Sequence, residues 1–217
     1  GFAPVVIEPM GRALPTLLPE ASSAAVQAGL ESLGVTFQFG AFASEVNRTA
    51  DGVQVVLSDG RRIDADVVLS AVGLRPRIAL AKAAGITVNR GIVTDRCLQT
   101  SAPDVYAIGD CAEVEGLVLL YVLPLMAEAR ALAKTLAGQP TQVDYPPMPV
   151  AIKTPACPVV VSPPPLGVNG QWTVEGDGAN TTALFHDVQG TLRGFALTGE
   201  ATAQKAALAK RLPAMLG

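Results

Sequence analysis

Histidine, cysteine and aromatic residues are scarce in this chain, and each scarcity excludes a class of site. One histidine, His186, is too few for a metal centre built from several imidazoles. The three cysteines, Cys97, Cys111 and Cys157, lack the C-x-x-C spacing of zinc knuckles and dithiol motifs. We therefore predict no metal site and a reducing, cytoplasmic location.

The chain also lacks an excess of positive charge and any long apolar run. The 16 Lys and Arg residues are outnumbered by 19 Asp and Glu residues, which argues against nucleic acid or an anionic membrane surface as a partner. No apolar run reaches the roughly 18 residues of a membrane span. What is present is a chain of 217 residues, 49% hydrophobic and rich in Ala, Val and Leu, which suits α/β layers with helices packed on sheets.

The order of apolar segments predicts three parts. We interpret residues 1–75 as the later half of a nucleotide-binding βαβ domain with an inserted β-meander, residues 76–145 as part of a second such domain, and residues 146–217 as a small α+β domain. Expected strands cover 5–7 (buried), 35–37, 42–47, 53–57, 63–67, 67–72, 92–98 (two short strands), 105–108, 159–161, 171–175, 179–186 and 192–197. Expected helices cover 14–33, a segment ending at 84, 124–137 with Pro124 at its first position, and 201–212.

A glycine and an aspartate follow the apolar run 105–108 at Gly109-Asp110. The glycine lets another molecule approach the backbone closely, and the aspartate offers two acceptor oxygens and no donor. A hydroxyl-rich ligand fits such a pair at the carboxyl end of a parallel sheet. The helix expected soon afterwards would direct its free N–H groups at negative charge, so the backbone of Val122 is a second candidate contact.

The segment T-x(5)-Y-A-I-G-D, residues 100–110, resembles the second flavin-binding signature of the FAD-dependent pyridine-nucleotide reductases. The resemblance implies that Asp110 bonds a ribityl hydroxyl, that Gly109 makes room for it, and that the helix start at Val122 meets the N1–C2=O edge of the flavin. It also implies the partial nucleotide-binding (Rossmann-like) domains of that fold, with 1–75 ending the NAD-binding domain and 76–145 ending the FAD-binding domain.

Two residues point to the nicotinamide cofactor. Glu8 ends the first strand, where an acid in a dinucleotide-binding fold bonds the adenosine ribose and disfavours a 2′-phosphate, favouring NADH. Residues 71–76 resemble the G-x-x-P close of the NAD domain, and Gly73 would allow the cofactor close approach. Both G-x-G-x-x-G loops are missing, so we expect the chain to be the back part of a longer protein and to hold FAD poorly alone.

Three further segments, residues 89–101, 118–138 and 150–158, resemble bacterial rubredoxin–NAD⁺ reductases. The resemblance implies electron transfer from NADH through FAD to rubredoxin, an acidic iron protein that serves alkane hydroxylases. It also implies Lys153 of the IKTP segment as a cofactor contact. Because the flavin carries the chemistry, we name no catalytic acid or base.

Other interpretations stay open. A ferredoxin reductase or an NADH oxidase of the same fold would share these motifs, and a non-catalytic flavin-fold module that binds a protein partner would lack the glycine-rich loops. His186 has no H-x-x-x-x-E context, so we interpret it as a strand residue, and Cys111 as a small buried thiol. We interpret the scattered positive charges as solvated faces: Arg75, Arg77, Lys82, Arg90 and Arg96, with Lys205, Lys210 and Arg211 on the last helix.

Overall fold

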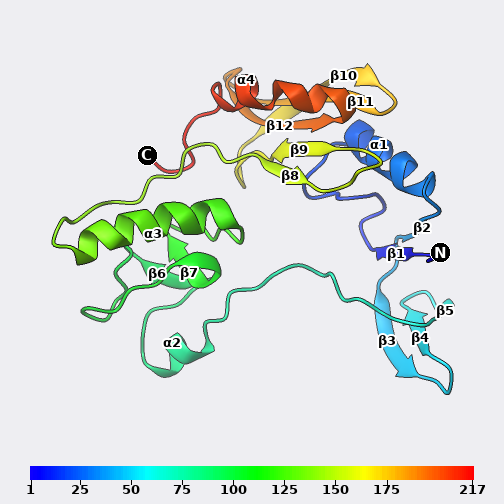
Figure 1. Cartoon of the computed structure of the whole chain (residues 1–217), viewed down its shortest axis with the longest axis horizontal. Helices are drawn as coiled ribbons and strands as arrows, with labels where there is room; N and C mark the ends of the chain where they lie inside the picture. The colour runs from blue at the N-terminus through cyan, green and yellow to red at the C-terminus, as the bar shows by residue number, and fades with distance from the viewer. The chain divides into compact units, whose positions relative to one another are not determined.

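A computed structural model describes all residues, 1–217, and divides into two compact units (Figure 1). Unit 1 combines Gly1–Ser70 with Pro149–Pro213, and unit 2 combines Ala71–Met148 with Ala214–Gly217. Each unit contains both helices and strands, so the predicted α/β character is confirmed. None of its helices has the length and apolar character required to cross a bilayer.

The largest element of unit 1 is a five-stranded antiparallel sheet with the order β10-β11-β12-β9-β8. Its strands are β8 (Val150–Ile152), β9 (Val159–Ser162), β10 (Gly170–Asp177), β11 (Asn180–Asp187) and β12 (Leu192–Thr198). Short turns join β10, β11 and β12 into a meander, as the alternating apolar pattern predicts. The proline-rich connector hides one strand, β8, which the sequence interpretation missed.

Helices cover both faces of this sheet (Figure 1). On one face, the side chains of Phe195 and Leu197 from β12 pack with Leu208 of α4 (Lys205–Ala209), which follows the 3-10 helix η2 (Gly199–Gln204). On the other face, Ala196 packs in one cluster with Val26 of α1 (Glu20–Glu31). Successive residues of β12 therefore face different helices, as the period of two in a strand requires.

A buried chain of hydroxyl groups fixes α1 to the sheet. Ser22 and Thr181 share a hydrogen bond of 2.9 Å between their hydroxyls, and Thr181 shares another of 2.9 Å with Thr198. All three side chains are buried, and the backbone N–H of Thr181 donates to the Thr198 hydroxyl. Because buried hydroxyls need hydrogen-bond partners, the Ser22–Thr181–Thr198 series specifies how α1 lies on the sheet.

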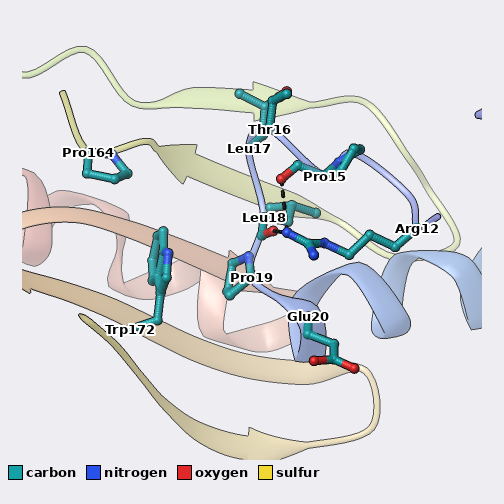
Figure 2. A pocket seen from close by; sticks show the side chains of 9 residues that line it. All are labelled: Arg12, Pro15, Thr16, Leu17, Leu18, Pro19, Glu20, Pro164 and Trp172. Carbon is teal, nitrogen blue, oxygen red and sulfur yellow. Dashed lines mark hydrogen bonds between the residues drawn. The ribbon is translucent and has the colours of Figure 1, made fainter. Parts of the chain in front are cut away.

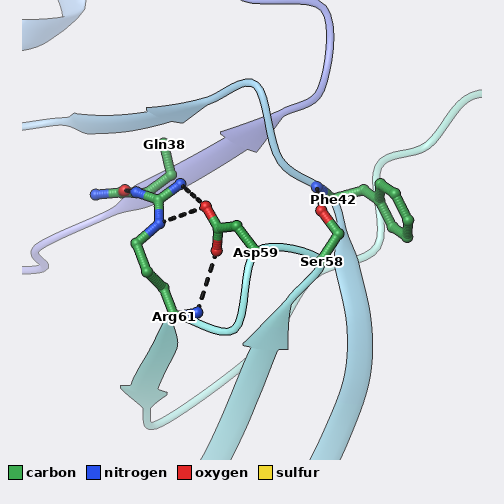
Figure 3. Close-up of polar contacts among 5 residues, drawn as sticks. All are labelled: Gln38, Phe42, Ser58, Asp59 and Arg61. Atoms are coloured by element: carbon green, nitrogen blue, oxygen red, sulfur yellow. Dashed lines mark hydrogen bonds and ion pairs between the residues drawn. The ribbon is translucent and has the colours of Figure 1, made fainter.

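The remainder of unit 1 contains two small sheets. Strand β1 (Val5–Glu8) pairs in parallel with β2 (Thr36–Phe39), while β3 (Ala43–Arg48), β4 (Val53–Leu57) and β5 (Arg62–Ala65) form the predicted antiparallel meander. In the β4–β5 turn, Arg61 forms a 2.7 Å ion pair with Asp59 and also bonds Gln38 of β2 (Figure 3). The side-chain bond from Arg61 lowers the pKa of Asp59 below its usual range.

Unit 2 is built around α3 (Val122–Leu136). It also contains α2 (Ala79–Ala83), a two-stranded parallel pair of β6 (Ile92–Thr94) and β7 (Ala112–Val114), and the 3-10 turn η1 (Gly109–Cys111). Ala131 of α3 packs with Leu98, Val114, Val143 and Tyr145. The predicted α3 is confirmed, although it begins at Val122, which places Pro124 third rather than first; Gly138 follows its end with a φ of +85°.

Several strand predictions are wrong, because an apolar run predicts burial and not a pairing partner. Residues 67–72 form no strand, and the Val72 side chain is 94% exposed, since no other segment of the chain hydrogen-bonds to this one. Residues 105–108 turn back at Asp104 onto 98–100 and make a single bridge, Tyr106 to Gln99, instead of a strand. Strand β1 exists but is not buried, because β2 is its only neighbour.

Three helix and strand boundaries also differ. Helix α1 begins at Glu20 rather than at 14, because Leu14 has a φ of 49° and the two prolines that follow break the first turn. Only one strand, β6, forms in 92–98, since the chain turns with an N–H bond from Leu98 to the Asp95 carbonyl. The last helix is shorter than 201–212, because its first part is the 3-10 helix η2.

Candidate functional site

The Gly109-Asp110 pair lies in η1 and is held against α3. Gly109 is buried with a φ of +76°, and a Cβ there would lie 3.2 Å from a methyl carbon of Leu125. Its N–H donates to the carboxylate of Glu128 at 2.5 Å. Asp110 is exposed and accepts no hydrogen bond within the chain, so its carboxylate is free to accept from a ligand.

The N-terminus of α3 offers donors in the same unit. Tyr121 is the N-cap residue and provides no side-chain cap. The N–H groups of Val122 and Leu123 have no acceptor, and the Val122 side chain is 67% exposed. Since unsatisfied N–H groups and the helix dipole favour negative charge, this end of α3 suits an anionic ligand edge.

Glu128, which holds the Gly109 turn, was missed by the sequence interpretation. It is only 3% exposed, and it accepts a second hydrogen bond from the Tyr145 hydroxyl at 2.7 Å. Burial, and then the bond to Glu128, raise the pKa of Tyr145 above its usual value. The spacing of Pro124, Glu128 and Ala131 along one buried face of α3 is the signal that could have found it.

The other predicted contacts lie apart from this turn or in the other unit. Glu8 ends β1 in unit 1, and one carboxylate oxygen accepts the Met10 N–H at 2.8 Å, which leaves the other free. Lys153 follows β8 in unit 1, is exposed and has no partner. Gly73 begins unit 2 with a φ of +96°, and no atom lies within 4 Å of where its Cβ would be. Within unit 2, the structure places Gly109 and Asp110 in η1 beside Leu125 of the first turn of α3, the helix that begins at Val122.

His186 and Cys111 contact only neighbouring parts of the fold. His186 lies in β11 beside a bulge, as predicted for a strand residue. Cys111 is half-buried, and its thiol donates to the Ile108 carbonyl at 3.4 Å; burial raises the pKa of this thiol. No group of three His, Cys, Asp or Glu side chains could hold a metal ion.

A second buried carboxylate, Glu113 of β7, holds the turn at residues 89–91, just before β6. It accepts hydrogen bonds from the Gly91 N–H at 2.8 Å and the Asn89 amide at 2.9 Å. Burial acts to raise the pKa of Glu113, but these bonds and Arg90 outweigh it, so the pKa is lowered. The cluster tethers the 89–91 turn to β7.

This cluster predicts an acid-sensitive contribution to stability. A lowered carboxyl pKa contributes stability that is complete above the unfolded value of about 4.3 and is lost as the pH falls through the folded value. We expect Glu113→Gln to lower the free energy of unfolding by about 1–3 kcal/mol at pH 7. Urea titrations of both proteins from pH 7 to pH 3 should show the difference shrinking below about pH 4.3. A difference that stays constant would contradict this role.

One cavity in unit 1 lies between the segment before α1 and the antiparallel sheet (Figure 2). Its volume is about 270 Å³. The Arg12 guanidinium, on one side, donates to the Pro15 carbonyl at 3.1 Å, and Trp172 lies on the other. The lining residues are Arg12, Pro15, Thr16, Leu17, Leu18, Pro19, Glu20, Pro164 and Trp172.

Comparison with known proteins gives two family matches along the chain. A family described as pyridine nucleotide-disulphide oxidoreductase matches residues 3–136, and one described as rubredoxin binding C-terminal domain matches residues 142–212. A rubredoxin-NAD(+) reductase of Alcanivorax borkumensis is 59% identical over all 217 residues, and the chain spans 57% of its length. A nitric oxide reductase FlRd-NAD(+) reductase of Aeromonas salmonicida is 39% identical over 92% of the chain and 52% of its own length.

Solved structures show the same fold. A ferredoxin reductase from Rhodopseudomonas palustris superposes with a TM-score of 0.81 at 27% identity, over 91% of this chain and 50% of that one. A putidaredoxin reductase, solved in covalent complex with putidaredoxin, gives a TM-score of 0.83 at 24% identity, over 98% and 54%. The predicted fold class is therefore confirmed.

Proposed function

The chain belongs to the pyridine nucleotide-disulphide oxidoreductase family, and from this membership we propose that it acts in an FAD-dependent oxidoreductase that passes electrons from NADH through FAD to rubredoxin. The observation that carries the proposal is the order of the two family matches: residues 3–136 are followed at once by a rubredoxin-binding match over 142–212. The identity of 59% to a rubredoxin-NAD(+) reductase supports it further.

The residues around η1 fit FAD. The Asp110 carboxylate would accept hydrogen bonds from ribityl hydroxyls, because it is exposed and has no partner of its own. Gly109 takes a φ of +76°, which lets the chain turn at this point beside Leu125, and the free N–H of Val122 would meet the electron-rich edge of the ring. When bound, FAD supplies the hydride acceptor and the electron donor, while these residues orient it and stabilise negative charge on its edge.

The contacts to NADH and the second set of FAD contacts are proposed on the family resemblance and on exposure. The free oxygen of Glu8 would bond the adenosine ribose and disfavour a 2′-phosphate. Gly73 would let the nicotinamide cofactor approach the chain, and the exposed Lys153 would contact FAD. No side chain is assigned as a catalytic acid or base.

The same proposal includes the division of the chain into domains, its cellular location and its physiological role. The proposed division is 1–75, 76–145 and 146–217; the gap between the two family matches, at 136–142, lies near its second boundary, and the change of compact unit after Ser70 lies near its first. The three cysteines are free, which supports a reducing cytoplasm. The physiological role would be electron supply to alkane hydroxylases during alkane degradation.

The acceptor can be tested in a chimera in which this chain replaces the matching 217 residues of the Alcanivorax borkumensis relative. We expect NADH oxidation to be at least about tenfold faster with rubredoxin than with ferredoxin or oxygen, a preference of about 1.4 kcal/mol. The unmodified relative is the control. Faster turnover with ferredoxin, or peroxide formation without rubredoxin reduction, would identify one of the alternative oxidoreductases. A chimera that binds no FAD would favour a non-catalytic module.

A second candidate acceptor has its own support. The 39% identical Aeromonas salmonicida relative is a nitric oxide reductase FlRd-NAD(+) reductase, so the protein this name abbreviates as FlRd is included among the acceptors tested. The higher identity to the rubredoxin reductase, 59%, favours rubredoxin as the first choice.

A further inference from the structure

Glu128 is a buried acid with no cation beside it. Its side chain is 3% exposed, and no Lys, Arg or His forms an ion pair with it. Both carboxylate oxygens accept one hydrogen bond each, from the Gly109 N–H at 2.5 Å and from the Tyr145 hydroxyl at 2.7 Å. Because burying a carboxylate without a counter-ion is costly, a residue of this kind calls for a specific role.

The two bonds join elements that carry proposed cofactor contacts. Glu128 lies six residues after Val122 on the same helix, about 9 Å along its axis. Its bond to Gly109 therefore fixes η1 at a set distance from the N-terminus of α3. The carboxylate of Asp110, the next residue, makes no hydrogen bond within the chain, so the backbone of η1 sets its position.

We propose that Glu128 is a positioning residue of the flavin site: it holds the Gly109-Asp110 turn so that Asp110 and the Val122 N–H reach one FAD molecule together. This inference rests on the proposed function. Neither family description nor the names of the relatives assign a role to this carboxylate.

Tyr145 holds the second oxygen of Glu128 and is itself anchored. Its N–H donates to the Leu216 carbonyl at 2.8 Å, and its carbonyl accepts the Met215 N–H at 2.8 Å. The Tyr145 ring is fully buried in the core of unit 2. Tyr145, which is itself bonded to Met215 and Leu216, thus fixes one oxygen of the Glu128 carboxylate, and the other oxygen holds the turn at Gly109.

The positioning role can be tested by NMR on the 217-residue chain, with Glu128→Gln as the main variant. Glutamine keeps the shape and can still accept from Gly109, but it removes the charge. We expect the Gly109 amide proton to move upfield and to exchange with solvent about tenfold faster. On titration with FAD to millimolar concentration, the dissociation constant read from the Asp110 and Val122 amide shifts should rise about fivefold to tenfold. Tyr145→Phe should produce the same changes to a smaller extent.

Glu113→Gln is the matched control, because it removes another buried carboxylate of unit 2 that also accepts a glycine N–H, from Gly91. It should leave both the Gly109 amide and FAD binding unchanged. An unchanged Gly109 amide and unchanged FAD binding in Glu128→Gln, or equal losses in both variants, would overturn the positioning role while FAD binding by the parent chain upholds the site. If FAD at millimolar concentration shifts neither the Asp110 nor the Val122 amide of the parent chain, the cofactor site itself is wrong, and the role of Glu128 with it.

Discussion

Replacing Asp110 with alanine is expected to raise the dissociation constant of FAD by about 10- to 100-fold, because hydrogen bonds to a charged acceptor contribute about 1.5–3 kcal/mol. Asp110 is exposed and makes no bond within the chain, so its removal leaves no buried group unsatisfied and should not change folding. The loss would therefore report the ligand contact alone. FAD binding is best measured by fluorescence titration of the apo form of the chimera described above.

Two variants sharpen this test. Asp110→Asn keeps the size and one acceptor oxygen but removes the charge, so it should fall between the parent and the alanine variant. Asp66→Ala removes another exposed acid, in unit 1, and should bind FAD like the parent. Parent-like affinity in Asp110→Ala would refute the assignment of the Gly109-Asp110 turn to the flavin.

The hydrophobic periodicity predicted the strands that pair with their neighbours in sequence. Strands β10, β11 and β12 pair with their sequence neighbours, so alternation and turn residues are enough to identify them. The run 67–72 is just as apolar but forms no strand, because pairing depends on a partner that composition does not reveal. The role of α1 as the cover of a distant sheet was hidden for the same reason: its partners, such as Ala183, lie more than 150 residues away.

The site was predictable where a local motif marks it. Gly109 and Asp110 are adjacent, and the open N-terminus of α3 follows from its place before a clear helix. Glu128 was missed because its two partners, Gly109 and Tyr145, lie 19 and 17 residues away in sequence. A charged residue on the buried face of a helix signals an unseen polar partner, but sequence alone cannot identify which one.

The second large effect concerns the antiparallel sheet of unit 1. Phe195 is fully buried at the centre of β12, against Leu208 of α4. We expect Phe195→Ala to lower the free energy of unfolding by about 3–5 kcal/mol, through lost burial and the cavity it leaves. Trp172, the single tryptophan, packs edge-on against Phe185 of the same sheet at 5.4 Å, so its fluorescence in urea reports this transition. Val188→Ala, at an 82% exposed position, should change it by less than about 0.5 kcal/mol.

The face of the same sheet that packs against α1 raises a separate question: whether the sheet is stable without this helix. The rubredoxin-binding family match covers 142–212 and leaves out α1, yet Val26 of α1 is buried against β9, β11 and β12. If the sheet and α1 unfold together, Val26→Ala should shift the Trp172 transition by about 1–2 kcal/mol. An unshifted transition in Val26→Ala, beside a large shift in Phe195→Ala, would show that the sheet is stable without α1. A shift in both would show that the packing of α1, from the first part of the chain, contributes to the stability of the sheet.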